Sequence, residues 1–307
     1  MKNTINFYYN IFLDELIKKD NCYYFYYGGD EYYFVPLNRP YDDVQGIYKL
    51  NLEMKKRKCL VHELILNKDK SIITVVNGIS YVLIKLCKYK NDKVFLNDIN
   101  YIQNMTVNIE CDKSLVRNDW IKLWSEKIDY YEYQISEVGK KYPLLCDSLS
   151  YFIGMGENAI SYLVNNLDSK TNVNLVVSHK RIYQERGSLN FYDPLNFVVD
   201  SRVRDVAEFI KETFYNKTLN SYDLKSYFNM ANLNKNEYIL LLGRLLFPTY
   251  YFDIYDDIIN NGKSEELVIN IIDRTDEYES LLNTIYKFIL YEKKVRLEPI
   301  EWLQDKN

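Results

Sequence analysis

Histidine and cysteine are scarce in this sequence, and their scarcity restricts the chemistry open to it. Only two histidines occur among 307 residues, which excludes a histidine-rich metal site. The cysteines are odd in number, scattered and without a CxxC pair; they are Cys22, Cys59, Cys87, Cys111 and Cys146. This pattern excludes a disulfide framework and a thiolate zinc site, and it predicts reduced, buried thiols in the cytosol.

Long apolar runs and an excess of charge of either sign are also missing. No run of eighteen apolar residues occurs, and the N-terminus lacks the basic region and apolar core of a signal peptide. We therefore expect neither membrane insertion nor secretion by that route. The 39 basic and 43 acidic residues nearly balance, with a net charge of -4. This balance predicts that neither nucleic acid nor an anionic membrane is a partner.

The first part of the chain, residues 1–89, has the pattern of a small α/β lobe. Two aromatic runs flank Gly28-Gly29-Asp30, which indicates a hairpin. The expected elements are a helix over 3–19, hairpin strands at 23–27 and 32–35, a helix over 41–57, and strands at 71–76 and 80–87. Hairpin, helix and two strands follow one another in the order of a kinase N-lobe.

The rest of the chain, residues 90–307, reads as a larger helical lobe. Apolar residues recur at intervals of three and four, beginning near residue 114, so they line single faces of helices. Helices are expected from 114, over 144–167, 203–216, 221–230, 235–260, 264–272 and 275–291, with one buried strand at 173–177. That strand leads directly to His179.

One glycine pattern suggests a different function. Gly154, Gly156 and Ala159 satisfy the GxGxxA dinucleotide-binding pattern. A genuine fingerprint follows a strand, opens a helix and has an acidic residue about 20 positions later at the end of a second strand. Here the preceding residues continue a helical stretch, and the strand at 173–177 ends in Ser178-His179. We interpret the pattern as a coincidence.

The segment between residues 179 and 208 carries the most chemical information. It contains His179-Lys180-Arg181-Ile182, then Asp193-Pro194, then Asp205-Val206-Ala207. Sugar and aminoglycoside phosphotransferases have a His-Gly-Asp-Leu-x-x-x-Asn loop, a strand ending in a metal-binding Asp, and an Asp-Leu-Ala that opens a helix. The segment resembles all three parts in outline, and the resemblance implies an α+β, two-lobed protein-kinase-like fold with a small β-rich N-lobe and a large helical C-lobe.

The catalytic groups of that outline are replaced. Aligned on His179, the general base falls on Arg181 and the metal-binding Asn falls on Arg186. A guanidinium has only donors and stays charged, so it neither accepts a proton nor binds a cation. Asp193 remains, twelve residues before Asp205. One carboxylate is a poor magnesium site, and a turn residue before Pro194 is the simpler interpretation of Asp193.

The parts that would hold ATP are reduced as well. A kinase has a glycine-rich loop over the phosphates and a lysine on the next strand. The hairpin turn has only Gly28 and Gly29, and Phe34-Val35-Pro36-Leu37 contains no lysine. Glu53 could be the helix carboxylate that pairs with such a lysine; the alternative is a solvated helix face beside Lys55 and its basic neighbours. We therefore expect no cofactor, Mg-ATP included.

Five segments resemble the YutH-type endospore coat-associated proteins, which are related to CotS-type coat proteins of the kinase-like superfamily. They are Gly154 with Glu157-Asn158-Ala159-Ile160, the segment 193–201 (Asp193-Pro194-Leu195-Asn196-Phe197-Val198-Val199-Asp200-Ser201), the segment 244–253 (Arg244-Leu245-Leu246-Phe247-Pro248-Thr249-Tyr250-Tyr251-Phe252-Asp253), the segment 276–282 (Asp276-Glu277-Tyr278-Glu279-Ser280-Leu281-Leu282) and Pro299-Ile300-Glu301-Trp302-Leu303. The similarity runs over nearly the whole chain, and the short, tyrosine-rich N-lobe departs from it. The resemblance implies a sporulation protein of the spore coat, assembled in the mother-cell cytoplasm, with other coat proteins as partners.

The sequence thus predicts a pseudokinase: a catalytically degenerate, kinase-like binding or structural component. The alternatives are an atypical small-molecule kinase that keeps Asp193 and recruits another base, and a pseudokinase that still binds nucleotide. No residue is assigned a catalytic or metal-binding role. Lys180, Arg181, Arg186 and Arg204 are the candidate anion site, unless they form salt bridges with Glu185, Asp200 and Glu208. Asp205 is expected to be structural, accepting hydrogen bonds from the backbone of the loop that begins at His179.

Overall fold

The computed structural model describes residues 1–89, 91–167, 173–185 and 187–304. The chain divides into two compact units, which we call the first and the second unit. The first unit comprises Met1–Val116 with Leu175–Asp200, and the second comprises Arg117–Asn174 with Ser201–Asn307. The boundary between lobes at residues 89 and 90 is a different division of the chain, and it stays a prediction.

The hairpin of the first unit is confirmed. Strands β2 (Cys22–Tyr27) and β3 (Asp30–Pro36) pair antiparallel, with Tyr27 opposite Asp30. The loop therefore has two residues, Gly28 and Gly29, whose φ angles are 60° and 83°. A two-residue loop whose twist matches the strands needs positive φ at both positions, which glycine adopts without steric cost.

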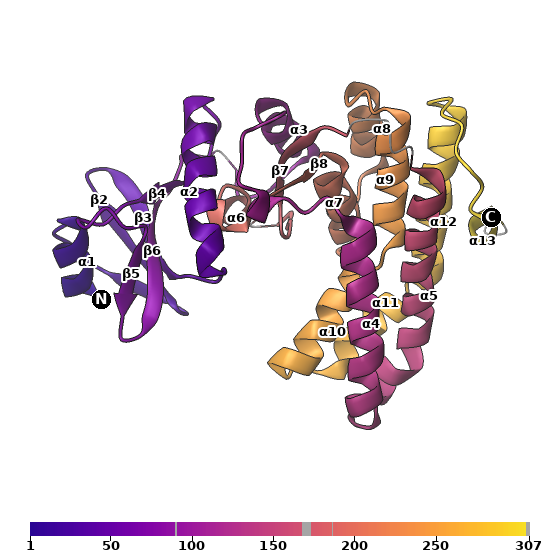
Figure 1. Cartoon of the computed structure of the whole chain (residues 1–307), viewed down its shortest axis with the longest axis horizontal. Helices are drawn as coiled ribbons and strands as arrows, with labels where there is room; N and C mark the ends of the chain where they lie inside the picture. Colours follow the sequence, from indigo (N-terminus) through magenta and orange to yellow (C-terminus); the bar gives the residue numbers. More distant parts are fainter. Residues whose placement is uncertain (90, 168–172, 186, 305–307) are drawn as a thin grey trace. The chain divides into compact units, whose positions relative to one another are not determined.

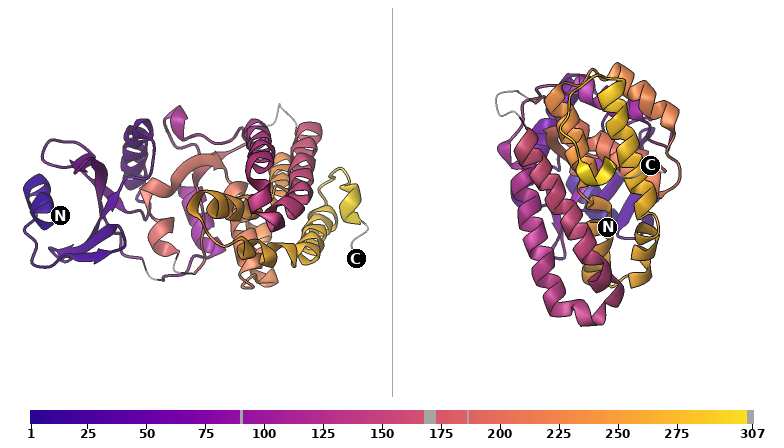
Figure 2. Two further views of the ribbon diagram at one scale, coloured as in Figure 1. Left: turned by 90° about the horizontal axis from the view of Figure 1, so that it is seen from below. Right: turned by 90° about the vertical axis from the view of Figure 1, so that its right-hand side faces the viewer.

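This hairpin belongs to a six-stranded antiparallel sheet (Figure 1). The strands are hydrogen-bonded in the order β1-β2-β3-β6-β4, and β5 pairs with β6 as well. The remaining strands are β1 (Ile17–Lys19), β4 (Glu63–Ile65), β5 (Ile73–Val76) and β6 (Ile79–Lys85). The sheet lies between helices α1 (Lys2–Tyr9) and α2 (Tyr41–Lys56) in both views (Figures 1 and 2).

The two N-terminal helix predictions had different outcomes. The helix expected over 3–19 is wrong beyond Tyr9, because Asn10 adopts a left-handed conformation (φ 53°) and ends α1. The helix expected over 41–57 is confirmed as α2, which has acidic residues in its first turn and lysines in its last. These charges oppose the helix dipole and stabilise both ends.

A small two-stranded sheet in the first unit positions the candidate site. Strand β7 (Leu175–His179) pairs with β8 (Phe197–Ser201). The short helices α6 (Ser188–Phe191) and η3 (Pro194–Asn196) lie between them in sequence. Helix α3 (Leu96–Met105) packs on β7, where Thr106 Oγ1 accepts a hydrogen bond of 3.0 Å from Val177 N. Helix η1 (Lys113–Leu115) follows α3 in the chain.

The second unit is helical. Helices α4 (Trp120–Val138) and α5 (Pro143–Asn166) form an antiparallel hairpin through η2 (Gly139–Lys141), and they lie side by side in Figures 1 and 2. The others are α7 (Val203–Tyr215), α8 (Ser221–Met230), α9 (Lys235–Leu246), α10 (Thr249–Asn261), η4 (Glu265–Val268), α11 (Ile269–Ile272), α12 (Thr275–Tyr291) and α13 (Glu301–Gln304). Helices α8 and α12 have the predicted bounds. The single helix expected over 235–260 is two, because Pro248 cannot donate a backbone hydrogen bond and breaks the run.

Two expectations from composition can be compared with this fold. Among the described residues, no helix is long and apolar enough to cross a membrane. All five cysteines are free thiols, as expected, but the prediction that they are buried is wrong for four of them. Only Cys59 is buried, and Cys146 is exposed on α5, whose outer face tolerates a small polarizable side chain.

Candidate functional site

His179, at the end of β7, is a packing residue in this fold. Its side chain is buried, and Nε2 lies 2.8 Å from the carbonyl oxygen of Phe191. Because a carbonyl only accepts, Nε2 must carry the proton. The ring stacks on Phe191 at 4.3 Å and meets Phe197 edge-on at 5.3 Å. His179 thus fixes the start of the loop that follows β7.

Asn196 holds the next two residues of this loop. Its backbone oxygen accepts from Lys180 N at 2.8 Å, and its side-chain Oδ1 accepts from Arg181 N at 3.3 Å. Its Nδ2 donates to the carbonyl oxygens of Arg181 (2.9 Å) and Asn190 (3.2 Å). These bonds use both ends of a buried amide, so Asn196 is a structural clamp. Sequence reasoning gave it no role, although it lies three residues after Asp193.

Arg181 occupies the place expected for a general base, and its guanidinium turns back onto the loop. Nη1 donates to the carbonyl oxygen of Lys180 at 2.7 Å. Arg186, the residue at the expected metal-ligand position, lies outside the described residues. Glu185 pairs with Lys93 at 2.6 Å on the surface, which accounts for one of the acids that were expected to bind the basic cluster.

Asp193 is the retained carboxylate, and it acts locally as a helix cap. It is 7% exposed and accepts a hydrogen bond of 2.8 Å from Leu195 N at the start of η3. Burial raises its pKa to about 7, opposed by the Leu195 bond and by the charges of Arg39 and Lys180. Within the described ranges, no group of three or more His, Cys, Asp or Glu side chains could hold a metal ion.

A buried ion pair beside Asp193 escaped the sequence analysis. Arg39, which precedes α2, pairs with Asp43 in the first turn of that helix at 3.1 Å. Its Nη1 also donates to the carbonyl oxygens of Leu195 (3.1 Å) and Phe197 (2.6 Å). The sequence signal for this pair was the i, i+4 spacing of Arg39 and Asp43 at the start of a helix, because side chains at that spacing lie close enough to form an ion pair.

Glu53, the other candidate for a helix carboxylate, pairs on its own helix. It contacts Lys56 at 3.1 Å and Arg57 at 3.6 Å. The hydrogen bond from Lys56 is the main cause of its lowered pKa. This geometry matches the solvated-face interpretation.

Arg204 and Asp205 belong to the second unit, at the start of α7. Both are buried, with Asp205 only 1% exposed. The four-residue anion site formed with Lys180 and Arg181 stays a prediction, as does the reach of Asp205 to the loop at His179.

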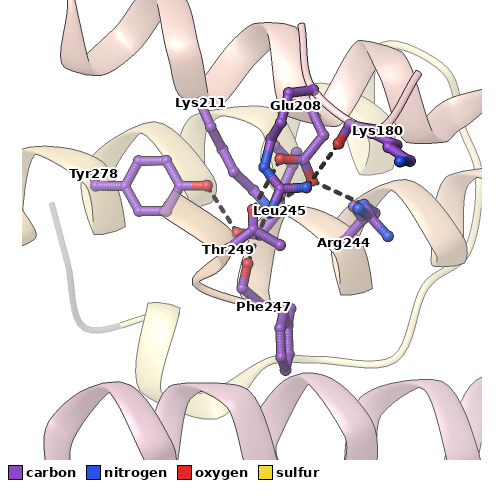
Figure 3. Close-up of polar contacts among 9 residues, drawn as sticks. Lys180, Glu208, Lys211, Arg244, Leu245, Phe247, Thr249 and Tyr278 are labelled. Carbon is purple, nitrogen blue, oxygen red and sulfur yellow. Dashed lines mark hydrogen bonds and ion pairs between the residues drawn. The ribbon is translucent and has the colours of Figure 1, made fainter. Parts of the chain in front are cut away.

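The segment 244–253 contributes to a buried ionic network in the second unit (Figure 3). Glu208 accepts from Arg244 Nε at 2.8 Å, from Lys211 at 3.2 Å and from Thr249 Oγ1 at 2.9 Å. Lys211 also donates to the carbonyl oxygen of Phe247, at the break between α9 and α10. Burial lowers the pKa of Lys211 to about 8, opposed by Glu208. The segment 244–253, one of the five that resemble the coat-associated family, thus has a structural role at the break between α9 and α10.

The GxGxxA pattern lies inside helix α5, away from any strand, so its interpretation as a coincidence holds. Gly156 has a packing reason, because a Cβ there would lie 3.0 Å from Ile128 Cδ1.

An antiparallel sheet with an inserted helix, followed by a mostly helical remainder, defines a kinase-like phosphotransferase fold. The structure of an aminoglycoside phosphotransferase from Alicyclobacillus acidocaldarius matches with a TM-score of 0.63 at 9% identity, covering 92% of this chain and 94% of that one. Spectinomycin phosphotransferase matches with 0.58 at 9% identity (86% and 89% covered), and amicoumacin kinase with 0.52 at 12% identity (98% and 95%). Identities this low establish the fold alone.

Residues 2–285 match the family described as "Spore coat putative kinase YutH", and the chain belongs to that family. It is 29% identical over 206 residues to the endospore coat-associated protein YutH of Bacillus subtilis (strain 168). That alignment covers 60% of this chain and 61% of the relative, so it spans about three fifths of the relative's length.

Proposed function

We propose that this protein is a catalytically degenerate member of its kinase-like fold and serves as a binding or structural component of the spore coat. The observation that carries the proposal is Arg181 at the base position, with its guanidinium donating to the Lys180 carbonyl. Phosphoryl transfer needs a carboxylate near the attacking hydroxyl, and arginine cannot take its proton.

We also propose that the protein does not bind Mg-ATP. One carboxyl oxygen of Asp193 accepts a hydrogen bond from Leu195 N. Burial raises the pKa of this carboxyl group to about 7, so its charged form is disfavoured near neutral pH. The side-chain oxygen of Asn196, three residues after Asp193, accepts from Arg181 N. Magnesium is usually held by one or two ionised carboxylates together with phosphate oxygens.

The Arg39–Asp43 pair supports a structural use of the same region. In kinases a lysine on the third strand binds the phosphates and pairs with a glutamate of the next helix. Here the cation follows β3 and the acid lies in α2, but the guanidinium donates to the Leu195 and Phe197 carbonyls. Nη1 is thus bonded to backbone carbonyls, and Nη2 to the Asp43 carboxylate.

An atypical small-molecule kinase that keeps Asp193 and recruits another base is the second candidate. The observation that favours it is the retained carboxyl group of Asp193, three residues before Asn196, which binds the backbone N–H groups of Lys180 and Arg181. A third candidate is a pseudokinase that binds nucleotide. A thermal-shift titration with ATP and magnesium separates a protein that binds no nucleotide from the second and third candidates, both of which bind it. A nucleotide at 100 times its Kd would stabilise the native state by about 2.7 kcal/mol. We expect no change in the melting temperature. An increase that needs both ATP and magnesium would contradict the proposal that the protein binds no nucleotide.

The proposed location is the mother-cell cytoplasm and then the spore coat, with other coat proteins as partners. Support comes from the family and from the printed name of the Bacillus subtilis relative. A fluorescent fusion of the full chain expressed in a spore-forming host tests this. We expect fluorescence around the developing spore and in the extracted coat fraction, whereas a signal that stays dispersed in the mother cell would contradict it.

A further inference from the structure

The second unit contains a pocket of about 440 Å³ that none of the preceding functions uses. It is lined by Ser150, Tyr151, Gly154, Met155 and Asn158 of α5, by Glu279 of α12 and by Trp302 of α13. The Tyr151 hydroxyl donates to Glu279 Oε1 and so joins α5 to α12. The volume falls within the usual range for small-ligand sites.

The carboxylate and the aromatic rings of this pocket suit a cation. Glu279 is 4% exposed, so its charge acts in a medium that screens it weakly. Tyr151 and Trp302 also line the pocket, and the faces of such aromatic rings attract ammonium and guanidinium groups. Burial, together with the hydrogen bond to Glu279, raises the pKa of Tyr151, so the phenol stays a neutral donor.

The charges on the lining elements all have one sign near the pocket. Helix α5 contains two acidic residues and no lysine or arginine over its 24 residues. The first three turns of α12 contain three acids and no basic residue, and the one charge of α13 is Glu301. Arg274, just before α12, is paired with Glu277 at 2.8 Å.

Gly154 keeps the pocket open. A Cβ at this position would have nothing within 4 Å, so packing does not require glycine there, unlike Gly156. Glycine inside a helix weakens it relative to alanine, and its usual benefit is a close approach to the backbone. A ligand can therefore lie directly against α5.

We infer that this pocket binds a primary ammonium or guanidinium group carried on an apolar stem, with Glu279 as the counter-charge and Tyr151 and Trp302 beside the stem. The cation would come either from a free amine or from a lysine or arginine side chain of a protein. The residues belong to the second unit and Asp193 to the first, so variants at this pocket and variants at Asp193 test the two proposals separately.

Ligand-observed NMR with the full chain at low ionic strength tests the inference. The probes are 1,5-diaminopentane, acetyl-Gly-Lys-Gly-amide, and the same peptide with neutral norleucine in place of lysine. Binding of the diamine alone identifies a free amine, and binding of the lysine peptide identifies a protein side chain; both support the site. No binding of either cation, or equal binding of the norleucine peptide, would overturn it.

Three variants locate the binding. Glu279→Gln removes the charge but keeps an acceptor for Tyr151, and should weaken binding about tenfold or more. Gly154→Leu should fold, because the space beside Gly154 is open, and should block the pocket to the same extent. Glu292→Gln changes the net charge equally at the exposed end of α12 and should leave affinity unchanged. Full affinity in Gly154→Leu, or an equal loss in Glu292→Gln, would contradict the assignment.

Discussion

Arg39 Nη1 lies 2.6 Å from the carbonyl oxygen of Phe197, a bond that ties the residues before α2 to the first residue of β8. The same nitrogen donates to Leu195, two residues after Asp193, while Nη2 pairs with Asp43. These bonds tie the turn that carries Asp193 to the residues at the start of α2.

Removing this guanidinium should be costly. Arg39→Ala would leave Asp43 buried without its cation and the Phe197 and Leu195 carbonyls without this donor, so we expect a loss of about 3–5 kcal/mol in the free energy of unfolding. Arg39→Lys keeps the charge but loses the planar set of guanidinium donors, so its free energy of unfolding should lie between those of the parent and Arg39→Ala. Urea denaturation measures the loss. The exposed Arg296→Ala is the control, and an Arg39→Ala loss no larger than the control's would contradict the role.

Asp193 should make stability depend on pH. Its pKa is raised to about 7 in the folded protein from about 3.9 in the unfolded chain. Its favourable contribution to the free energy of unfolding is therefore complete below about pH 4 and is lost as the pH rises through 7. Asp193→Asn keeps a side-chain oxygen for Leu195 N and has no charge. As the pH rises from 5 to 8, the free energy of unfolding of the variant should therefore increase by up to about 3 kcal/mol relative to that of the parent. If the difference in the free energy of unfolding between Asp193→Asn and the parent is the same at pH 5 and pH 8, the carboxyl group does not titrate in this range.

Asp205 is expected to be structural. It is 1% exposed, and removing a buried carboxylate leaves its donors unsatisfied, at a cost of about 1–3 kcal/mol or more. Asp205→Ala should lower the denaturation midpoint accordingly. Asp223→Ala, an exposed acid in the first turn of α8, controls for the helix dipole and should change little. An unchanged midpoint in Asp205→Ala would argue against the structural role.

The basic residues Lys180, Arg181, Arg186 and Arg204 are expected to bind sulfate, phosphate or an acidic peptide in a salt-sensitive way. Arginine forms charge-assisted hydrogen bonds with such anions, and salt weakens them. Titration with sulfate at low ionic strength measures the affinity. Arg181→Ala with Arg186→Ala should abolish the binding. If the double variant binds as the parent does, or the parent binds nothing, the anion site does not exist.

Local sequence rules predicted the elements whose ends are fixed by local chemistry. Gly28 and Gly29 determine their hairpin, and α12 has the predicted bounds because its apolar stripe is regular. The rules were wrong where a single backbone conformation decided the outcome, as at Asn10, or where a proline divided a continuous pattern, as at Pro248.

The site was harder to predict because its contacts join distant parts of the chain. His179, Arg181 and Asp193 could be named from spacing. Arg39 and Asn196 could not, because their roles depend on carbonyl groups that only the fold brings near: Leu195 and Phe197 are more than 150 residues from Arg39. A lysine was sought on β3, and the cation lies three residues beyond it, on the loop to α2.

The most direct test of the account is phosphoryl transfer. The full chain, incubated with labelled ATP and magnesium, is offered small alcohols, amino sugars and generic protein substrates, with Asp193→Ala run in parallel. The account predicts no transfer above background, equal in the two proteins, because Arg181 cannot act as a base. Turnover by the parent chain that disappears in Asp193→Ala would contradict it and establish an active kinase.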